Sequence, residues 1–175
     1  RCLAFNDRVL EVLQSLENVK LVVLSSPFSY YLTGTPMWRV TEHGLVSAPP
    51  TRGQILDSFA KVVEAARLRD AEVVVVGPTP RYEKADMGYC AEKLLAGRWL
   101  PPHLSGCVID RAEAEVQQRD ALDFLADLHE FTGVRIVDLF DVLCDEAKCM
   151  TGNDGYNLYQ DYGHLSRRGS EYVVG

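Results

Sequence analysis

Three short segments of the chain carry nearly continuous runs of apolar, β-branched residues. They cover residues 19–25, 71–77 and 134–139. A continuous apolar run of this length is typical of a strand that is covered on both faces, whereas a half-buried strand alternates apolar and polar residues. The pattern therefore predicts a parallel β-sheet with buried strands.

Around these strands, apolar residues recur at the spacing of amphipathic helices. The predicted helices cover residues 5–16, 53–68 and 112–132. We expect their buried faces to contain Phe5, Val9, Val12, Leu13 and Leu16 in the first helix, Ile55, Leu56, Phe59, Val62, Val63 and Ala66 in the second, and Val116, Leu122, Leu125 and Leu128 in the third. Because helices and strands alternate, the sequence predicts the α/β fold class, with right-handed βαβ crossovers and a doubly wound sheet.

Two long connections follow the first two predicted strands, over residues 25–52 and 77–102. Their prolines, glycines and polar residues predict irregular structure. Open parallel sheets bind ligands beyond the carboxyl ends of their strands, which is where both connections begin. We therefore expect functional residues near these loops.

The composition narrows the functional classes. Of the 175 residues, 47% are hydrophobic and 25% are charged, and the formal net charge is −7. This balance fits a single globular domain over residues 1–175, and the negative charge argues against a nucleic-acid partner. No apolar run reaches the roughly 18 residues of a membrane-spanning helix.

Because the sequence begins at Arg1 without a methionine and stops inside a predicted helix, we expect it to be a piece of a longer protein.

The five cysteines do not have the paired spacing of a zinc site. Only Cys144 and Cys149, with four residues between them in a short polar segment, come close. That spacing favours a local disulfide, with free thiols or a metal site as the alternatives. The partners of Cys2, Cys90 and Cys107 stay open.

The segment from Asp161 to Gly169 contains the sharpest candidate for chemistry. Asp161 and His164 are three residues apart, and Ser166 is a suitable N-cap for a helix that continues through Glu171. In such a turn, the carboxylate accepts a hydrogen bond from one imidazole nitrogen while the other nitrogen faces outward as a general base. The alternative is a turn-forming aspartate beside a surface or capping histidine.

The motif D-x-x-H-L-S-x-x-G over residues 161–169 resembles the last block of SGNH hydrolases. More closely, it resembles the SGNH domain that is fused to membrane acyltransferase-3 proteins, which O-acetylate surface carbohydrates. Residues 2–6, 22–25, 76–80, 143–149 and 158–161 are similar to further segments of that family. The resemblance implies a three-layer α/β/α sandwich with a flavodoxin-like parallel sheet that lacks its first strand in this chain.

The resemblance also assigns roles to residues. His164 would act as the general base, Asp161 would orient it, and Cys144 and Cys149 would form the family's cysteine pair. The family's nucleophile is a serine in a G-D-S motif, which does not occur in the chain. We therefore expect the serine upstream of Arg1 and expect these 175 residues to be inactive alone. Asn6, Ser25 and Ser26 are candidates for oxyanion or substrate contacts; the alternative is a capping asparagine and two hydroxyls at a strand end.

As a function, the resemblance implies transfer of an acyl group, by way of a serine ester, onto a hydroxyl of a cell-surface or periplasmic carbohydrate. Acetyl is the expected acyl group. The expected partners are that carbohydrate and an acyl donor delivered by a membrane acyltransferase domain of the same parent chain, without any cofactor or metal. The location would be the bacterial periplasm, tethered to the inner membrane. A free-standing SGNH carbohydrate esterase and a non-catalytic glycan-binding α/β domain remain as alternatives.

Overall fold

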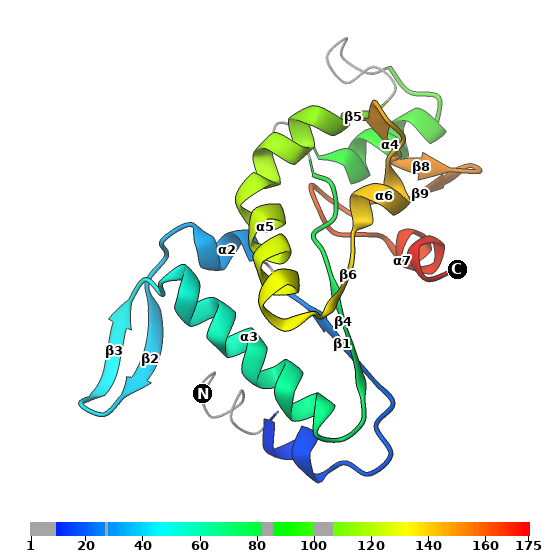
Figure 1. The fold of residues 1–175 in the computed structure, drawn as a ribbon. Helices are drawn as coiled ribbons and strands as arrows, with labels where there is room; N and C mark the ends of the chain where they lie inside the picture. The colour runs from blue at the N-terminus through cyan, green and yellow to red at the C-terminus, as the bar shows by residue number, and fades with distance from the viewer. Residues whose placement is uncertain (1–9, 27, 82–85, 100–106) are drawn as a thin grey trace. The chain divides into compact units, whose positions relative to one another are not determined.

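The computed structural model describes residues 10–26, 28–81, 86–99 and 107–175 (Figure 1). The chain divides into two compact units. The first consists of Arg1–Gly77 and Asp120–Val137, and the second of Pro78–Arg119 and Asp138–Gly175. Asn6 and Cys2, named above, lie outside the described residues.

The first unit is built on a parallel sheet of three strands, β1 (Leu21–Ser25), β4 (Glu72–Val76) and β6 (Arg135–Val137) (Figure 1). Their order in the sheet is β1-β4-β6. Leu21 pairs with Glu72, and Val74 pairs with Arg135. These are the three segments that the hydrophobic runs predicted, so the α/β class and the parallel sheet are confirmed.

Two helices supply most of the remaining core of the first unit. Helix α3 (Arg52–Arg67) begins with a capping box formed by Thr51 and Gln54, and helix α5 (Arg111–Thr132) is the longest of the described helices. Both confirm helices predicted from the sequence. Their apolar side chains pack with Val73 and Val75 of β4 and with Phe28 of the short helix α2 (Phe28–Leu32).

Burial in the first unit differs from the prediction at two places. Strand β4 is buried on both faces, but on β1 the side chains of Leu21 and Val23 are 51% and 56% exposed. The prediction that both faces of β1 are covered is therefore wrong for the described residues. Only Val22 and Leu24 of this strand pack against the hydrophobic core. In the first predicted helix, the described residues 10–15 are helical and Leu13 is buried, whereas Phe5 and Val9 lie outside the described residues. Val12 and Leu16, placed on the same face by the sequence analysis, are 45% and 47% exposed.

The connection over residues 25–52 is more regular than predicted. It contains helix α2 and an antiparallel hairpin of β2 (Met37–Thr41) and β3 (Gly44–Ala48) (Figure 1). The prediction of irregular structure was wrong here because proline and glycine mark the turns at the ends of these elements and say little about the residues between.

The second unit consists of short elements. Helices α4 (Met87–Leu95), α6 (Leu139–Leu143) and α7 (Arg167–Val174) accompany two small antiparallel pairs. Strand β5 (Ile109–Asp110) pairs with β7 (Lys148–Cys149), and β8 (Gly152–Asn153) pairs with β9 (Tyr156–Asn157). Helix α4 lies within the second connection that was predicted to be irregular, and α7 begins after the predicted N-cap, Ser166.

The part of α5 in the second unit corrects one predicted face. Val116 is 60% exposed, whereas Ala114 and Gln118 are buried. The buried series 114, 118, 121, 125 and 128 follows the three- and four-residue steps of a helix face, and Val116 falls outside it. A polar side chain, Gln118, therefore occupies a position of the buried face.

Candidate functional site

Asp161 and His164 lie in a tight turn between β9 and α7. The turn is closed by backbone pairing, because the N–H of Gln160 donates to the carbonyl of His164 at 2.8 Å and Tyr159 forms an antiparallel bridge with Leu165. Within the turn, the Oδ1 atom of Asp161 accepts hydrogen bonds from the backbone N–H groups of Gly163 at 3.0 Å and His164 at 2.9 Å. The carboxylate is thus fixed by the backbone that follows it.

The imidazole of His164 is hydrogen-bonded to the same carboxylate. Its Nδ1 atom lies 2.8 Å from Oδ2 and 3.0 Å from Oδ1 of Asp161. A neutral ring that donates from Nδ1 has Nε2 as its acceptor, and the side chain of His164 is 85% exposed. The arrangement therefore presents a proton-accepting nitrogen to the surroundings.

The backbone also sets the charge of Asp161. The N–H groups of Gly163 and His164, followed by the hydrogen bond from the His164 ring, lower the pKa of the Asp161 carboxyl to about 2. Asp161 is therefore ionised throughout the neutral range. An anionic partner at Nδ1 fixes the tautomer of the ring and stabilises the imidazolium that forms when Nε2 takes a proton.

Two helices, α7 and α4, begin next to the turn and contact it or the strand before it. At the start of α7, the hydroxyl of Ser166 accepts from the N–H of Gly169 at 3.0 Å and donates to the carbonyl of Asn157 at 2.6 Å. At the start of α4, Gly88 lies so close to the turn that an added Cβ would be 2.8 Å from the backbone nitrogen of Asp161 and would overlap the carbonyl of Gln160. The end of the turn is thus tied to α7 and β9 through the Ser166 hydroxyl, and its start packs against the backbone of α4.

The serine candidates lie in the other unit. Ser25 ends β1 and is exposed, and the hydroxyl of Ser26 donates to the hydroxyl of Tyr31 at 3.0 Å. Asp161 and His164 belong to the second unit, so a shared site with Ser25 or Ser26 stays a prediction. The same holds for Asn6, which is outside the described residues.

Two disulfides lie in the second unit. One joins Cys144 and Cys149, with an S–S distance of 2.10 Å. The other joins Cys90 of α4 to Cys107, a pairing that the sequence analysis left open. Their separation of 17 residues matches no short sequence motif, so the pairing depends on tertiary structure.

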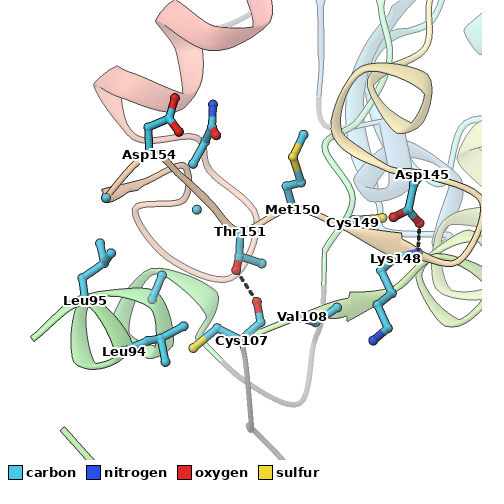
Figure 2. A pocket seen from close by; sticks show the side chains of 14 residues that line it. Leu94, Leu95, Cys107, Val108, Asp145, Lys148, Cys149, Met150, Thr151 and Asp154 are labelled. Atoms are coloured by element: carbon cyan, nitrogen blue, oxygen red, sulfur yellow. Dashed lines mark hydrogen bonds between the residues drawn. The ribbon is translucent and has the colours of Figure 1, made fainter. Parts of the chain in front are cut away.

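A pocket of about 370 Å³ opens beside the disulfides (Figure 2). Its apolar lining comes from Leu94 and Leu95 of α4 together with Val108 and Met150, and the hydroxyl of Thr151 donates to the carbonyl of Cys107 at its base. Neither Asp161 nor His164 lines this pocket. It is therefore a separate feature from the candidate acid–base pair.

Sequence reasoning missed three residues that contact the turn or its support. The hydroxyl of Thr79 donates to the carbonyl of Gly163, the side chain of Gln118 donates to the carbonyl of Thr79 at 3.0 Å, and the hydroxyl of Tyr159 donates to the carbonyl of Pro80 at 2.7 Å. Burial raises the pKa of Tyr159, which keeps that donor protonated. Thr79 and Tyr159 lie in segments 76–80 and 158–161, which resemble the family, and Gln118 is a polar residue at a buried position of an amphipathic helix.

The parallel sheet and the Asp161–His164 turn define an α/β domain of the SGNH type. The chain belongs to the family of SGNH domains fused to AT3 domains, whose model matches residues 1–175. The resemblance found in the sequence is therefore confirmed. Among the residues that the structure describes, no helix combines the length and apolar character needed to cross a membrane.

Among solved structures, the chain is similar to the periplasmic domain of a lipopolysaccharide acetyltransferase from Salmonella ser. Paratyphi A. The TM-score is 0.59 at 18% sequence identity, and the match covers 98% of this chain and 59% of the other. At this sequence identity, the similarity shows a shared fold and nothing further. A search of curated proteins finds no match.

Proposed function

We propose that this chain supplies the acid–base pair of an SGNH-type O-acyltransferase. The enzyme transfers an acyl group, specifically acetyl, to a hydroxyl of a cell-surface or periplasmic carbohydrate. The observation that carries the proposal is the hydrogen bond between Asp161 and Nδ1 of His164, which leaves Nε2 as an acceptor on an exposed side chain. Membership in a family of SGNH domains fused to AT3 domains supports it.

In the proposed reaction, Nε2 of His164 takes the proton of a serine hydroxyl as the serine oxygen attacks the acyl carbonyl of the donor. The proton then passes to the leaving group, and a serine ester remains. In the second half, His164 takes the proton of the carbohydrate hydroxyl, whose oxygen attacks the ester, and returns it to the serine. Asp161 stays ionised and stabilises the imidazolium in both halves.

The serine in this proposal precedes Arg1, so residues 1–175 would be inactive alone. The edge of the sheet is compatible with such an addition. Strand β1 has β4 on one side and no second strand partner within the described part of the chain, and Leu21 and Val23 on its outer face are exposed. A preceding strand would pair with this edge, and the helix after it would cover the two apolar side chains.

The parent protein would hold this domain in the periplasm, tethered to the inner membrane. A membrane acyltransferase domain of the same chain would deliver the acyl donor, which accounts for the fusion that defines the family. The disulfides at Cys144–Cys149 and Cys90–Cys107 fit an oxidising compartment of this kind.

The test is acetyl transfer by the full-length parent protein to its surface carbohydrate, with His164→Ala compared against His43→Ala. Both histidine side chains are 85% exposed, and both lie beside a carboxylate, Asp161 and Glu42 respectively. We expect His164→Ala to lower turnover by about 10²- to 10⁴-fold, the usual contribution of a general base, and His43→Ala to retain wild-type turnover.

Equal turnover in the two variants would refute the assignment of His164 as the base. Release of free acetate with no labelled carbohydrate, lost in His164→Ala, would show the same residues acting in an esterase, with water as the acceptor.

A further inference from the structure

The peptide unit between Gly163 and His164 is held at both ends. Its carbonyl oxygen, on Gly163, accepts a hydrogen bond from the hydroxyl of Thr79. Its N–H, on His164, donates to Oδ1 of Asp161 at 2.9 Å. Because a peptide unit is planar and rigid, these two bonds together fix its rotation and the position of the Cα of His164. The carbonyl of His164 accepts from the N–H of Gln160 at 2.8 Å, which restrains the next peptide unit, and the two restrained units together set the direction of the side chain.

Thr79 is itself held by buried side chains of the second unit. The amide Nε2 of Gln118 donates to the carbonyl of Thr79 at 3.0 Å, and the hydroxyl of Tyr159 donates to the carbonyl of the next residue, Pro80, at 2.7 Å. Gln118 is 2% exposed and Tyr159 is fully buried. The prolines at positions 78 and 80 further restrict the backbone on either side of Thr79.

Burying the polar side chain of Gln118 lowers the stability of the folded state, which indicates that this residue has a role beyond packing. Its Oε1 atom is buried and makes no hydrogen bond with any described residue. A buried acceptor without a partner destabilises the folded state, and an apolar side chain of similar length would avoid that loss. Its neighbours on the buried face of α5 are Ala114 and Ala121, so an apolar residue would match its surroundings.

From this geometry we propose that Thr79 and Gln118 are positioning residues for His164. Gln118 fixes Thr79, and Thr79 fixes the Gly163–His164 peptide, so that the imidazole is held against Asp161 in the orientation needed for proton transfer. This inference rests on the proposed acyltransferase function and adds two residues that act through His164 without contacting the reacting atoms.

The test uses the full-length parent protein and three variants. Thr79→Val keeps the shape of the side chain and removes the hydroxyl, Thr79→Ser keeps the hydroxyl, and Gln118→Met removes the amide at similar length. We expect kcat to fall about 10- to 100-fold in Thr79→Val, since a small displacement of a catalytic group has effects of that size, with KM for the carbohydrate unchanged. Thr79→Ser should restore most of kcat.

Gln118→Met separates positioning from stability. It removes one hydrogen bond and also removes the Oε1 atom, which has no hydrogen-bond partner among the described residues. We therefore expect its unfolding midpoint to stay at or above that of the wild type while kcat falls. Gln118→Met also tests the inference if Thr79→Val yields too little folded protein to assay. A kcat that stays at the wild-type value in folded Gln118→Met, or that is equal in Thr79→Val and Thr79→Ser, would overturn the inference.

A double variant completes the test. If Thr79 acts through His164, adding Thr79→Val to His164→Ala leaves kcat unchanged, whereas an independent structural effect lowers it further. The outcome also separates the two proposals. Full activity in His164→Ala refutes the proposed function, and the positioning roles with it. Loss of activity in His164→Ala with full activity in Thr79→Val refutes only the positioning roles.

Discussion

Gly88 offers a direct test of how the candidate turn is packed. It is the second residue of α4 and is buried, and its backbone conformation is open to any L-residue. In Gly88→Ala, the new Cβ would lie 2.8 Å from the nitrogen of Asp161, whereas ordinary van der Waals contact begins at 3.4 Å. It would also overlap the carbonyl of Gln160, and both obstacles are backbone atoms that cannot rotate aside.

The size of the effect follows from two opposing terms. Alanine favours a helix over glycine by about 1 kcal/mol. Overpacking costs about 1–3 kcal/mol, and we expect the upper end because backbone has to move. The net loss is therefore about 2 kcal/mol, which lowers the Tm of a protein of this size by about 4–8 °C.

A matched control is available in Gly53→Ala. Gly53 is also the second residue of its helix, α3, and an added Cβ there meets nothing within 4 Å. We expect this variant to gain about 0.5–1 kcal/mol because alanine restricts the unfolded chain. Thermal unfolding followed by circular dichroism gives both values. If the Tm of Gly88→Ala equals or exceeds that of Gly53→Ala, α4 does not pack tightly against the Asp161 turn, and the reasoning is refuted.

The remaining predictions concern protonation and the disulfides. The folded-state pKa of Asp161, about 2, lies below its ordinary value of 3.8, so its ionisation stabilises the fold above pH 3.8 and that contribution is lost as the pH falls through about 2. An NMR titration of the Asp161 carboxyl should show this low midpoint, and a midpoint at 3.8 or higher would contradict the backbone hydrogen bonds. Replacing Cys90 and Cys107 by alanine should cost about 3 kcal/mol of stability, against about 2 kcal/mol for Cys144 and Cys149, because loop entropy grows with the 17- and 5-residue separations. Denaturant unfolding measures both values, and the reverse order would contradict the loop-entropy explanation.

Local pattern was sufficient for the main elements and for the hydrogen-bonded pair of Asp161 and His164. The apolar runs located β1, β4 and β6, and the helical spacing placed α3 and α5 within a residue or two of their observed bounds. Asp161 and His164 could be paired because residues three apart in a turn are close in any fold. The N-cap role of Ser166 is equally local, since its bond partner is Gly169.

Only the tertiary structure decided which residues distant in the chain hold Asp161 and His164 in place. Thr79 and Gly163 are 84 residues apart in the chain, Gln118 and Thr79 are 39 apart, and Cys90 and Cys107 are 17 apart. Contacts at such separations depend on how the chain folds back on itself, which hydrophobic periodicity does not encode. The exposure of Val23 on β1 has the same cause, because whether an apolar face is covered depends on which other segment packs against it. The sequence thus determined the main helices and strands and the adjacent side chains of Asp161 and His164. The fold determined which residues distant in the chain hold those two side chains in place.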